Sequence, residues 1–173
     1  EFLVYNKIKK TIIKKELNMP FDIILPYSMV FEKDLSTDVS NTVEQNWDEL
    51  LQHIKSKQLF KNSLVVADNT GSMYQQKINS QYLTNKLPLN IAISFAILIA
   101  RCTECPYHNM ILNYSSDPTF TFLRKDESLL ESLYKITSMK NTILLSFFTT
   151  LHLILQNYIL NEEKDKKMIT QLI

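Results

Sequence analysis

The sequence is poor in the residues on which several large enzyme classes depend. Its 173 residues include one glycine, Gly71, which excludes the glycine-rich phosphate loops of the Walker and Rossmann kinds. The same shortage excludes a G-x-S-x-G nucleophile elbow. Two cysteines cannot build a disulfide framework, so Cys102 and Cys105 are expected to be reduced thiols of an intracellular, cytoplasmic protein.

Charge and apolar runs are also limited. The net charge is +1, and Arg101 and Arg124 are the only arginines, so no overall charge excess favours nucleic acid. The first residues are rich in lysine, which is not typical of a secretory signal. The longest apolar run, Leu89–Ala100, is too short to span a bilayer, so we expect no membrane span.

With 45% hydrophobic residues, the chain can still bury a core. We divide it into a helical flanking segment, residues 1–60, and an α/β domain, residues 61–173. Helices are predicted at Glu1–Leu17, Thr42–Lys57, Pro88–Cys102, Leu129–Ile136 and Thr142–Leu160. Extended segments or strands are predicted at Phe21–Leu25, Leu64–Ala67, Met110–Tyr114, Thr119–Leu123 and Met168–Ile173.

The flanking segment carries two notable features. Glu1–Leu17 has a lysine-rich face, which is typical of a solvated packing helix and would also suit RNA or a membrane surface. Asp34–Thr42 reads as a polar turn, with Thr42 placed to cap the helix that follows. In that helix, Trp47 is expected to anchor the segment to the domain.

The most informative motif follows the apolar run Leu64–Ala67, which is typical of a central parallel strand because it is apolar on both faces. Asp68, Thr70 and Ser72 alternate at its carboxyl end, with Gly71 available for a tight turn. One carboxylate and two hydroxyls are hard oxygen donors, suited to Mg²⁺ or Mn²⁺. An ordinary polar turn is the competing interpretation.

Three other groupings carry weaker signals. Cys102-x-x-Cys105 with His108 lacks a fourth zinc ligand, and Cys102 closes a helix, whereas redox pairs open one. His152 lies in an apolar helix and is expected to be a packing residue. Phe120 and Phe122 alternate on a strand and could stack RNA bases, although core packing is the commoner role of such a stripe.

Several ordered motifs over Pro20–Ile173 resemble von Willebrand factor A-type domains. The resemblance is greatest to a branch of eukaryotic and giant-virus proteins whose A-type domain is similar to that of the TROVE/Ro ribonucleoproteins. The motifs that carry it are Leu25-Pro26-Tyr27-Ser28-Met29, Trp47, Asp68-Asn69-Thr70-Gly71-Ser72-Met73, Pro88-Leu89-Asn90-Ile91-Ala92-Ile93, Tyr114-Ser115-Ser116-Asp117-Pro118, Ser128-Leu129-Leu130-Glu131 and Asn141-Thr142-Ile143.

The resemblance implies a Rossmann-like sheet with helices on both faces, incomplete at its C-terminal end. It further implies that Asp68, Thr70, Ser72 and Thr142 are ligands of Mg²⁺ or Mn²⁺. The second metal-site acid would follow the strand at Met168–Ile173, where the sequence stops, so the ion is expected to bind weakly or to be absent.

The function that the resemblance implies is a non-catalytic binding module that captures an acidic side chain of a protein ligand through its metal ion. Two alternatives are open. One is a phosphotransferase of the haloacid-dehalogenase type that uses Asp68 as nucleophile, although Thr70 stands where its general acid belongs. The other is an RNA-associated protein of the A-type class.

Overall fold

The computed structural model describes residues 17–28, 36–74, 87–104, 106–138, 146–160 and 171–173. The helices are α2 (Pro20–Ile23), α3 (Leu25–Ser28), α4 (Thr37–Ser56), η1, a 3₁₀ turn (Gly71–Tyr74), α5 (Pro88–Cys102), α6 (Leu129–Thr137) and α7 (Phe147–Leu160). The strands are β1 (Ser63–Ala67), β2 (Met110–Asn113), β3 (Phe120–Phe122) and β4 (Gln171–Leu172). Helices and strands together make a mixed α/β fold.

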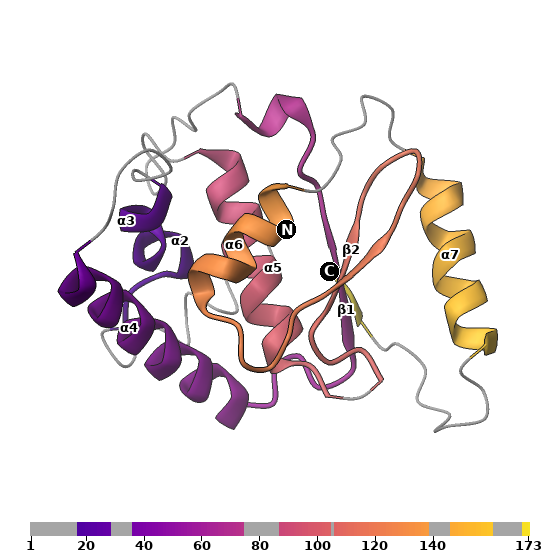
Figure 1. Cartoon of the computed structure of the whole chain (residues 1–173). Helices are drawn as coiled ribbons and strands as arrows, with labels where there is room; N and C mark the ends of the chain where they lie inside the picture. The colour runs from indigo at the N-terminus through magenta and orange to yellow at the C-terminus, as the bar shows by residue number, and fades with distance from the viewer. Residues whose placement is uncertain (1–16, 29–35, 75–86, 105, 139–145, 161–170) are drawn as a thin grey trace.

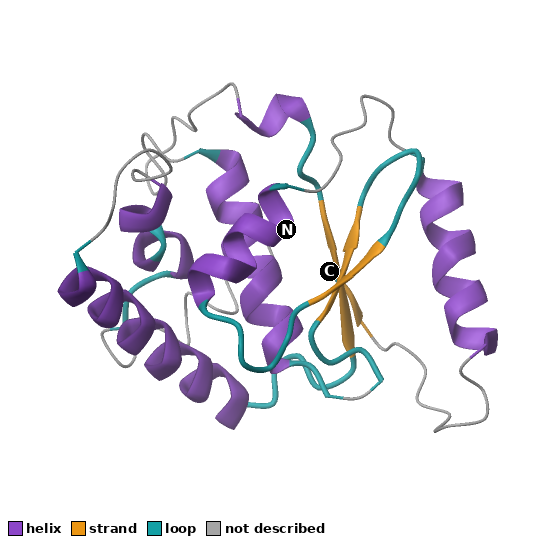
Figure 2. Ribbon diagram, viewed as in Figure 1, coloured by secondary structure: helices purple, strands orange, loops and turns teal. Residues whose placement is uncertain are grey.

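One four-stranded sheet lies at the centre, in the order β3-β2-β1-β4 (Figure 1). β1 pairs in parallel with β2 and with β4, and β3 pairs antiparallel to β2 at the edge. Figure 2 shows the sheet between two groups of helices, with α5 and α6 on one side and α7 on the other. The predicted hairpin of the second and third strands is confirmed.

The central strand β1 is buried from both sides. Val65 and Ala67 belong to the large apolar cluster that includes α4, α5 and α6. Leu64 faces the other way, into a smaller cluster against which Leu153 and Ile154 of α7 pack. Neighbouring side chains of a strand point to opposite faces, so a continuous apolar run is what a strand covered on both sides requires.

The large cluster also includes the flanking segment. Trp47 of α4 and Tyr27 of α3 are each 1% exposed, and both belong to the same cluster as the residues of α5. Trp47 therefore acts as the predicted anchor. Because one core joins the flank to the sheet, residues 17–60 support the domain structurally in the described part of the chain.

Polar contacts fix α6 against this core. Ser128 and Glu131 form a capping box at its N-terminus, in which each side chain accepts from the backbone N–H of the other residue. Glu44 of α4 accepts hydrogen bonds from Leu129 N–H, 3.0 Å away, and from the Tyr27 hydroxyl, 3.1 Å away. A carboxylate at a helix N-terminus also interacts favourably with the helix dipole.

A buried carboxylate precedes α6. Glu127 is 5% exposed, and it accepts hydrogen bonds from the Ser132 hydroxyl and from Lys135. Burial raises the pKa of Glu127, but the Arg124 backbone N–H, these two hydrogen bonds and the Lys135 charge outweigh burial and leave the pKa below its ordinary value. Arg101 of α5 joins the group by donating to Ser132.

Three predictions for the flanking segment are wrong. The segment Asp34–Thr42 is not a turn from Thr37 onward, because α4 begins there. Phe21–Leu25 is not extended, because Pro20 occupies the first turn of α2, where a proline ring is compatible with a helix, and the helix buries Phe21 and Ile23. Thr42 is not a cap, because α4 begins at Thr37 and Thr42 lies inside it. Its hydroxyl donates to the Asp38 carbonyl one turn earlier.

The remaining predicted helices and strands that fall on described residues are present, but some of their ends differ. Ser146 and Ile173 lie just outside α7 and β4, although the predicted helix and strand include them. α5 has the predicted bounds, and the ends of α6 and β2 differ from prediction by one residue each. Residues 1–16 and 142–145, predicted as helix, and residues 168–170, predicted as strand, lie outside the described residues. None of the described helices is long and apolar enough to cross a membrane.

The Glu127 network predicts a pH-dependent stability. Because folding lowers the pKa of Glu127, its stabilisation is complete above the unfolded pKa and is lost as the pH falls through the lower folded pKa. We expect Glu127→Gln to cost about 1–3 kcal/mol in urea unfolding at pH 7. The difference from the unsubstituted protein should begin to shrink below about pH 4.5, the ordinary pKa of glutamate, and should be smallest below the folded pKa, where both side chains are neutral. The exposed substitution Glu49→Gln in α4 should change neither quantity.

Candidate functional site

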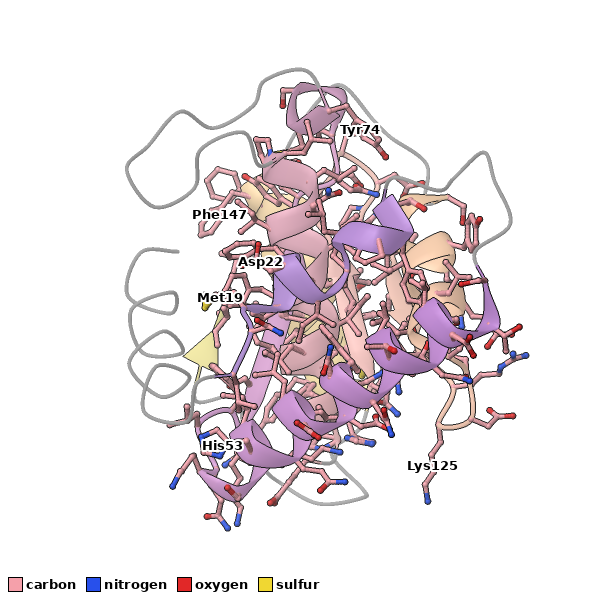
Figure 3. The ribbon with its side chains drawn as sticks, turned by 90° about the vertical axis from the view of Figure 1, so that its left-hand side faces the viewer. Met19, Asp22, His53, Tyr74, Lys125 and Phe147 are labelled. Atoms are coloured by element: carbon pink, nitrogen blue, oxygen red, sulfur yellow. The ribbon has the colours of Figure 1, made fainter. Side chains whose placement is uncertain are left out.

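The predicted D-x-T-x-S motif forms the loop between β1 and η1. Asp68 follows the last residue of β1 directly, and Ser72 lies in the 3₁₀ turn. The loop lies at the carboxyl edge of the parallel strands, the edge at which Tyr74 is labelled in Figure 3. Ligands of α/β sheets bind at this edge because the loops there are free to vary while the strands hold them in place.

Asp68 turns the chain at the end of β1. Its Oδ1 accepts a hydrogen bond from the Thr70 backbone N–H at 2.9 Å, which closes an Asx turn. Its Oδ2 has no hydrogen-bond partner among the residues that the structure describes. Asp68 is partly exposed, so this second oxygen can take a further partner from solvent or from a bound ion.

The two hydroxyls of the motif meet. Thr70 Oγ1 lies 3.0 Å from Ser72 Oγ, so one of them donates a hydrogen bond to the other. Oxygens bound about 2.0–2.1 Å from an octahedral Mg²⁺ are about 3 Å apart at adjacent positions. The observed spacing therefore fits one edge of such an octahedron, and the donor set is of the hard-oxygen type that Mg²⁺ prefers. Thr70 is 7% exposed, whereas Ser72 is open to solvent.

Asn69 is a structural residue of this loop, and sequence reasoning assigned it no contact. It is 2% exposed, and its Nδ2 donates a hydrogen bond to the Ile136 carbonyl near the end of α6, 3.3 Å away. Asn69 points away from solvent, into the body of the protein. This bond ties the loop to a helix that is 67 residues later in the chain.

The end of the neighbouring strand contributes a second polar group. Tyr114 N–H donates to the Ala67 carbonyl at 2.9 Å, which extends the pairing of β1 and β2 beyond β2 itself. The next residue, Ser115, is 1% exposed, and its Oγ has no partner among the described residues. From the sequence, Ser115 belonged only to a motif that resembles one of A-type domains. In the structure it lies beside the end of β1, because Tyr114 pairs with Ala67.

Comparison with known proteins gives the chain a family. The model of a family described as "Domain of unknown function (DUF7788)" matches residues 62–173. The chain belongs to the DUF7788 family. The matched region includes the four described strands and the D-x-T-x-S loop, whereas α2, α3 and α4 precede it.

One curated relative of this DUF7788 chain is "Uncharacterized protein L728" of Acanthamoeba polyphaga mimivirus. The two are 28% identical over 119 residues, which is 69% of the chain and 19% of the viral protein. The match therefore spans about a fifth of that relative's length. No solved structure matches the chain.

The structure brings together three of the four predicted metal ligands, Asp68, Thr70 and Ser72. Thr142 lies outside the described residues, and its place as the fourth ligand stays a prediction. In the described part of the chain, no three His, Cys, Asp or Glu side chains gather in a way that could hold a metal ion. The D-x-T-x-S loop offers one carboxylate and two hydroxyls, so it is not a grouping of that kind.

The other candidate residues lie elsewhere. Burial raises the pKa of Cys102 to about 12, although the Lys55 charge opposes it, so the side chain is a neutral thiol at physiological pH. Cys105 lies outside the described residues. Phe120 is half-buried against the smaller apolar cluster, whereas Phe122 is 56% exposed on the edge strand. Because residues two apart on a strand point to the same face, both rings lie on one face of β3, and only Phe122 is largely exposed there.

Asn69 gives a test of how the loop is held. Asn69→Ala removes a buried hydrogen bond and leaves the Ile136 carbonyl with the Ser138 backbone N–H as its donor, so we expect a loss of about 0.5–1.5 kcal/mol in the free energy of unfolding. Urea unfolding followed by circular dichroism would measure it. The matched control is Asn41→Ala on the exposed face of α4, which should be neutral or slightly stabilising because alanine favours helices. Equal stabilities for the two variants would contradict the role of Asn69.

Proposed function

We propose that this chain carries a divalent-metal binding module of the von Willebrand factor A type, in which Asp68, Thr70 and Ser72 supply oxygen ligands and Thr142 completes the set. The ion would hold an acidic side chain of a protein partner, and no bond would be made or broken. The observation that carries the proposal is the 3.0 Å spacing of the Thr70 and Ser72 hydroxyls in the loop that Asp68 begins, where Asp68 Oδ2 has no hydrogen-bond partner among the described residues.

The topology supports a Rossmann-like arrangement. Strand order 3-2-1-4 is the beginning of the 3-2-1-4-5-6 order of doubly wound sheets, and an antiparallel edge strand is common in such sheets. The chain moves from β1 outward to β3 and then returns to pair β4 with the other side of β1. The order thus reverses beside β1, and Asp68 lies at that switch point, where α/β proteins bind ligands.

The chemistry of a bound Mg²⁺ or Mn²⁺ would be that of a hard Lewis acid that accepts an anionic oxygen from the partner. Within the chain, the Thr70 N–H holds one Asp68 oxygen in place and leaves the other available. Asn69 fixes the backbone between the ligands by its bond to α6. The exposure of Ser72 leaves the loop accessible to a partner. The protein ligand is thus a proposal that rests on the loop alone.

Metal titration tests this proposal. Mn²⁺ binding to the full chain can be followed by electron paramagnetic resonance, because free and bound Mn²⁺ give different signals. We expect weak binding that Mg²⁺ displaces, and loss of that binding in Asp68→Asn. Ser72→Ala should weaken it by about tenfold, the effect of losing one charge-assisted contact.

Asp117→Asn is the matched control, because Asp117 is exposed and follows the neighbouring strand β2. It should bind Mn²⁺ as the unsubstituted protein does. Equal affinities for all variants would contradict the metal site. Turnover of an aryl phosphate that disappears in Asp68→Asn would instead contradict the non-catalytic role and favour a phosphotransferase.

A further inference from the structure

A hollow lies at the end of the molecule opposite to the D-x-T-x-S loop. It has a volume of about 540 Å³ and is formed by the C-terminal ends of α4 and α5 with the segments that follow them. Figure 3 labels His53, near the end of α4, at the opposite end of the molecule from Tyr74 of the D-x-T-x-S loop. The hollow is therefore separate from the candidate metal site. Its lining includes Lys55, Lys61, Glu104 and His108.

Lysines near helix C-termini often donate hydrogen bonds to the last carbonyls of the helix. In α4 and α5, several of these carbonyls already accept hydrogen bonds from other groups. At the end of α4, Lys57 N–H and Gln58 N–H donate to the carbonyls of Ile54 and Lys55. At the end of α5, the Ile99 carbonyl accepts from both the N–H and the hydroxyl of Thr103. These three carbonyls therefore do not need the ammonium groups as hydrogen-bond donors.

The charge that faces the hollow is positive. Lys55 forms no ion pair with any residue that the structure describes. Lys61 contacts Glu104 at 3.5 Å, but both side chains are nearly half-exposed, and such a pair contributes little and is easily rearranged. Two ammonium groups therefore face one carboxylate. The ammonium of Lys55 also lies near enough to oppose the burial effect on the Cys102 thiol, which lines the same hollow.

His108 also lines the hollow, and one of its ring nitrogens is held by the backbone. Its Nδ1 lies 2.6 Å from the Thr103 carbonyl oxygen, and a carbonyl can only accept, so Nδ1 carries the hydrogen. This bond fixes the orientation of the ring and leaves Nε2 without a partner among the described residues.

We propose that this hollow binds a small phosphate-bearing molecule, with its phosphate held between the Lys55 and Lys61 ammonium groups and near His108. Lysines are effective phosphate ligands as point charges. A volume of about 540 Å³ lies in the range of small-molecule sites, about 300–1,000 Å³. A concave site with two ammonium groups suits one phosphate group better than a nucleic-acid backbone, which needs an extended basic track.

Two phosphate probes, inorganic phosphate and adenosine monophosphate, test the site on the full chain. Adenosine, which lacks the phosphate, is the control compound. Titration at constant ionic strength can be followed by two-dimensional amide NMR spectra. We expect both phosphates to shift the amide signals of Lys61 and Glu104, and adenosine to leave them unchanged. Lys55→Met should weaken phosphate binding by about tenfold, as expected for loss of one charged contact.

Lys57→Met is the matched control, because Lys57 is exposed at the end of the same helix and does not line the hollow. It should bind both phosphates unchanged. An equal loss in Lys55→Met and Lys57→Met would show diffuse charge attraction and overturn the proposal. So would the absence of signal shifts, or tighter binding of single-stranded RNA that inorganic phosphate does not displace. Unchanged unfolding temperatures would show that both variants are folded.

Discussion

The burial of β1 on both faces is the constraint on which the rest of the structure depends. Leu64 and Val65 point into different apolar clusters, so the strand requires helices on both sides and a hydrogen-bonded neighbour at each edge. From Leu64 to Ala67 this strand has only apolar side chains. The first place where the chain can present a carboxylate is the loop that follows, and Asp68 stands there.

The helices that precede the DUF7788 region pack into the same apolar core as β1 and α5. Glu44 of α4 holds the N-terminus of α6 through Leu129 N–H, and the Ile136 carbonyl near the other end of α6 holds Asn69 of the loop. A continuous series of contacts thus connects the flank to the candidate metal site. Because each link is a hydrogen bond made in a buried or half-buried place, breaking one leaves a polar group without water.

The two ends of the sheet differ in chemistry. At the carboxyl edge, a carboxylate and two hydroxyls present oxygen, which suits a cation. At the other end, lysines at the close of α4 and in the segment before β1 present nitrogen and positive charge, which suit an anion. The sheet and α5 separate the two regions. Substitutions in one region do not change the residues of the other, so the metal site and the phosphate site can be tested independently.

The sequence determined what depends on neighbouring residues: the apolar run of β1, the helix that starts at Pro88, the hairpin of β2 and β3, and Asp68, Thr70 and Ser72 as one group. It misplaced Phe21–Leu25, because a proline is compatible both with extended chain and with a first helical turn, and burial chose the helix. Only the tertiary structure decided that Asn69 would meet Ile136, or that Lys55 and His108 would share one hollow. Such contacts join residues that are distant in the chain, and their geometry depends on how whole helices pack, which no local pattern encodes.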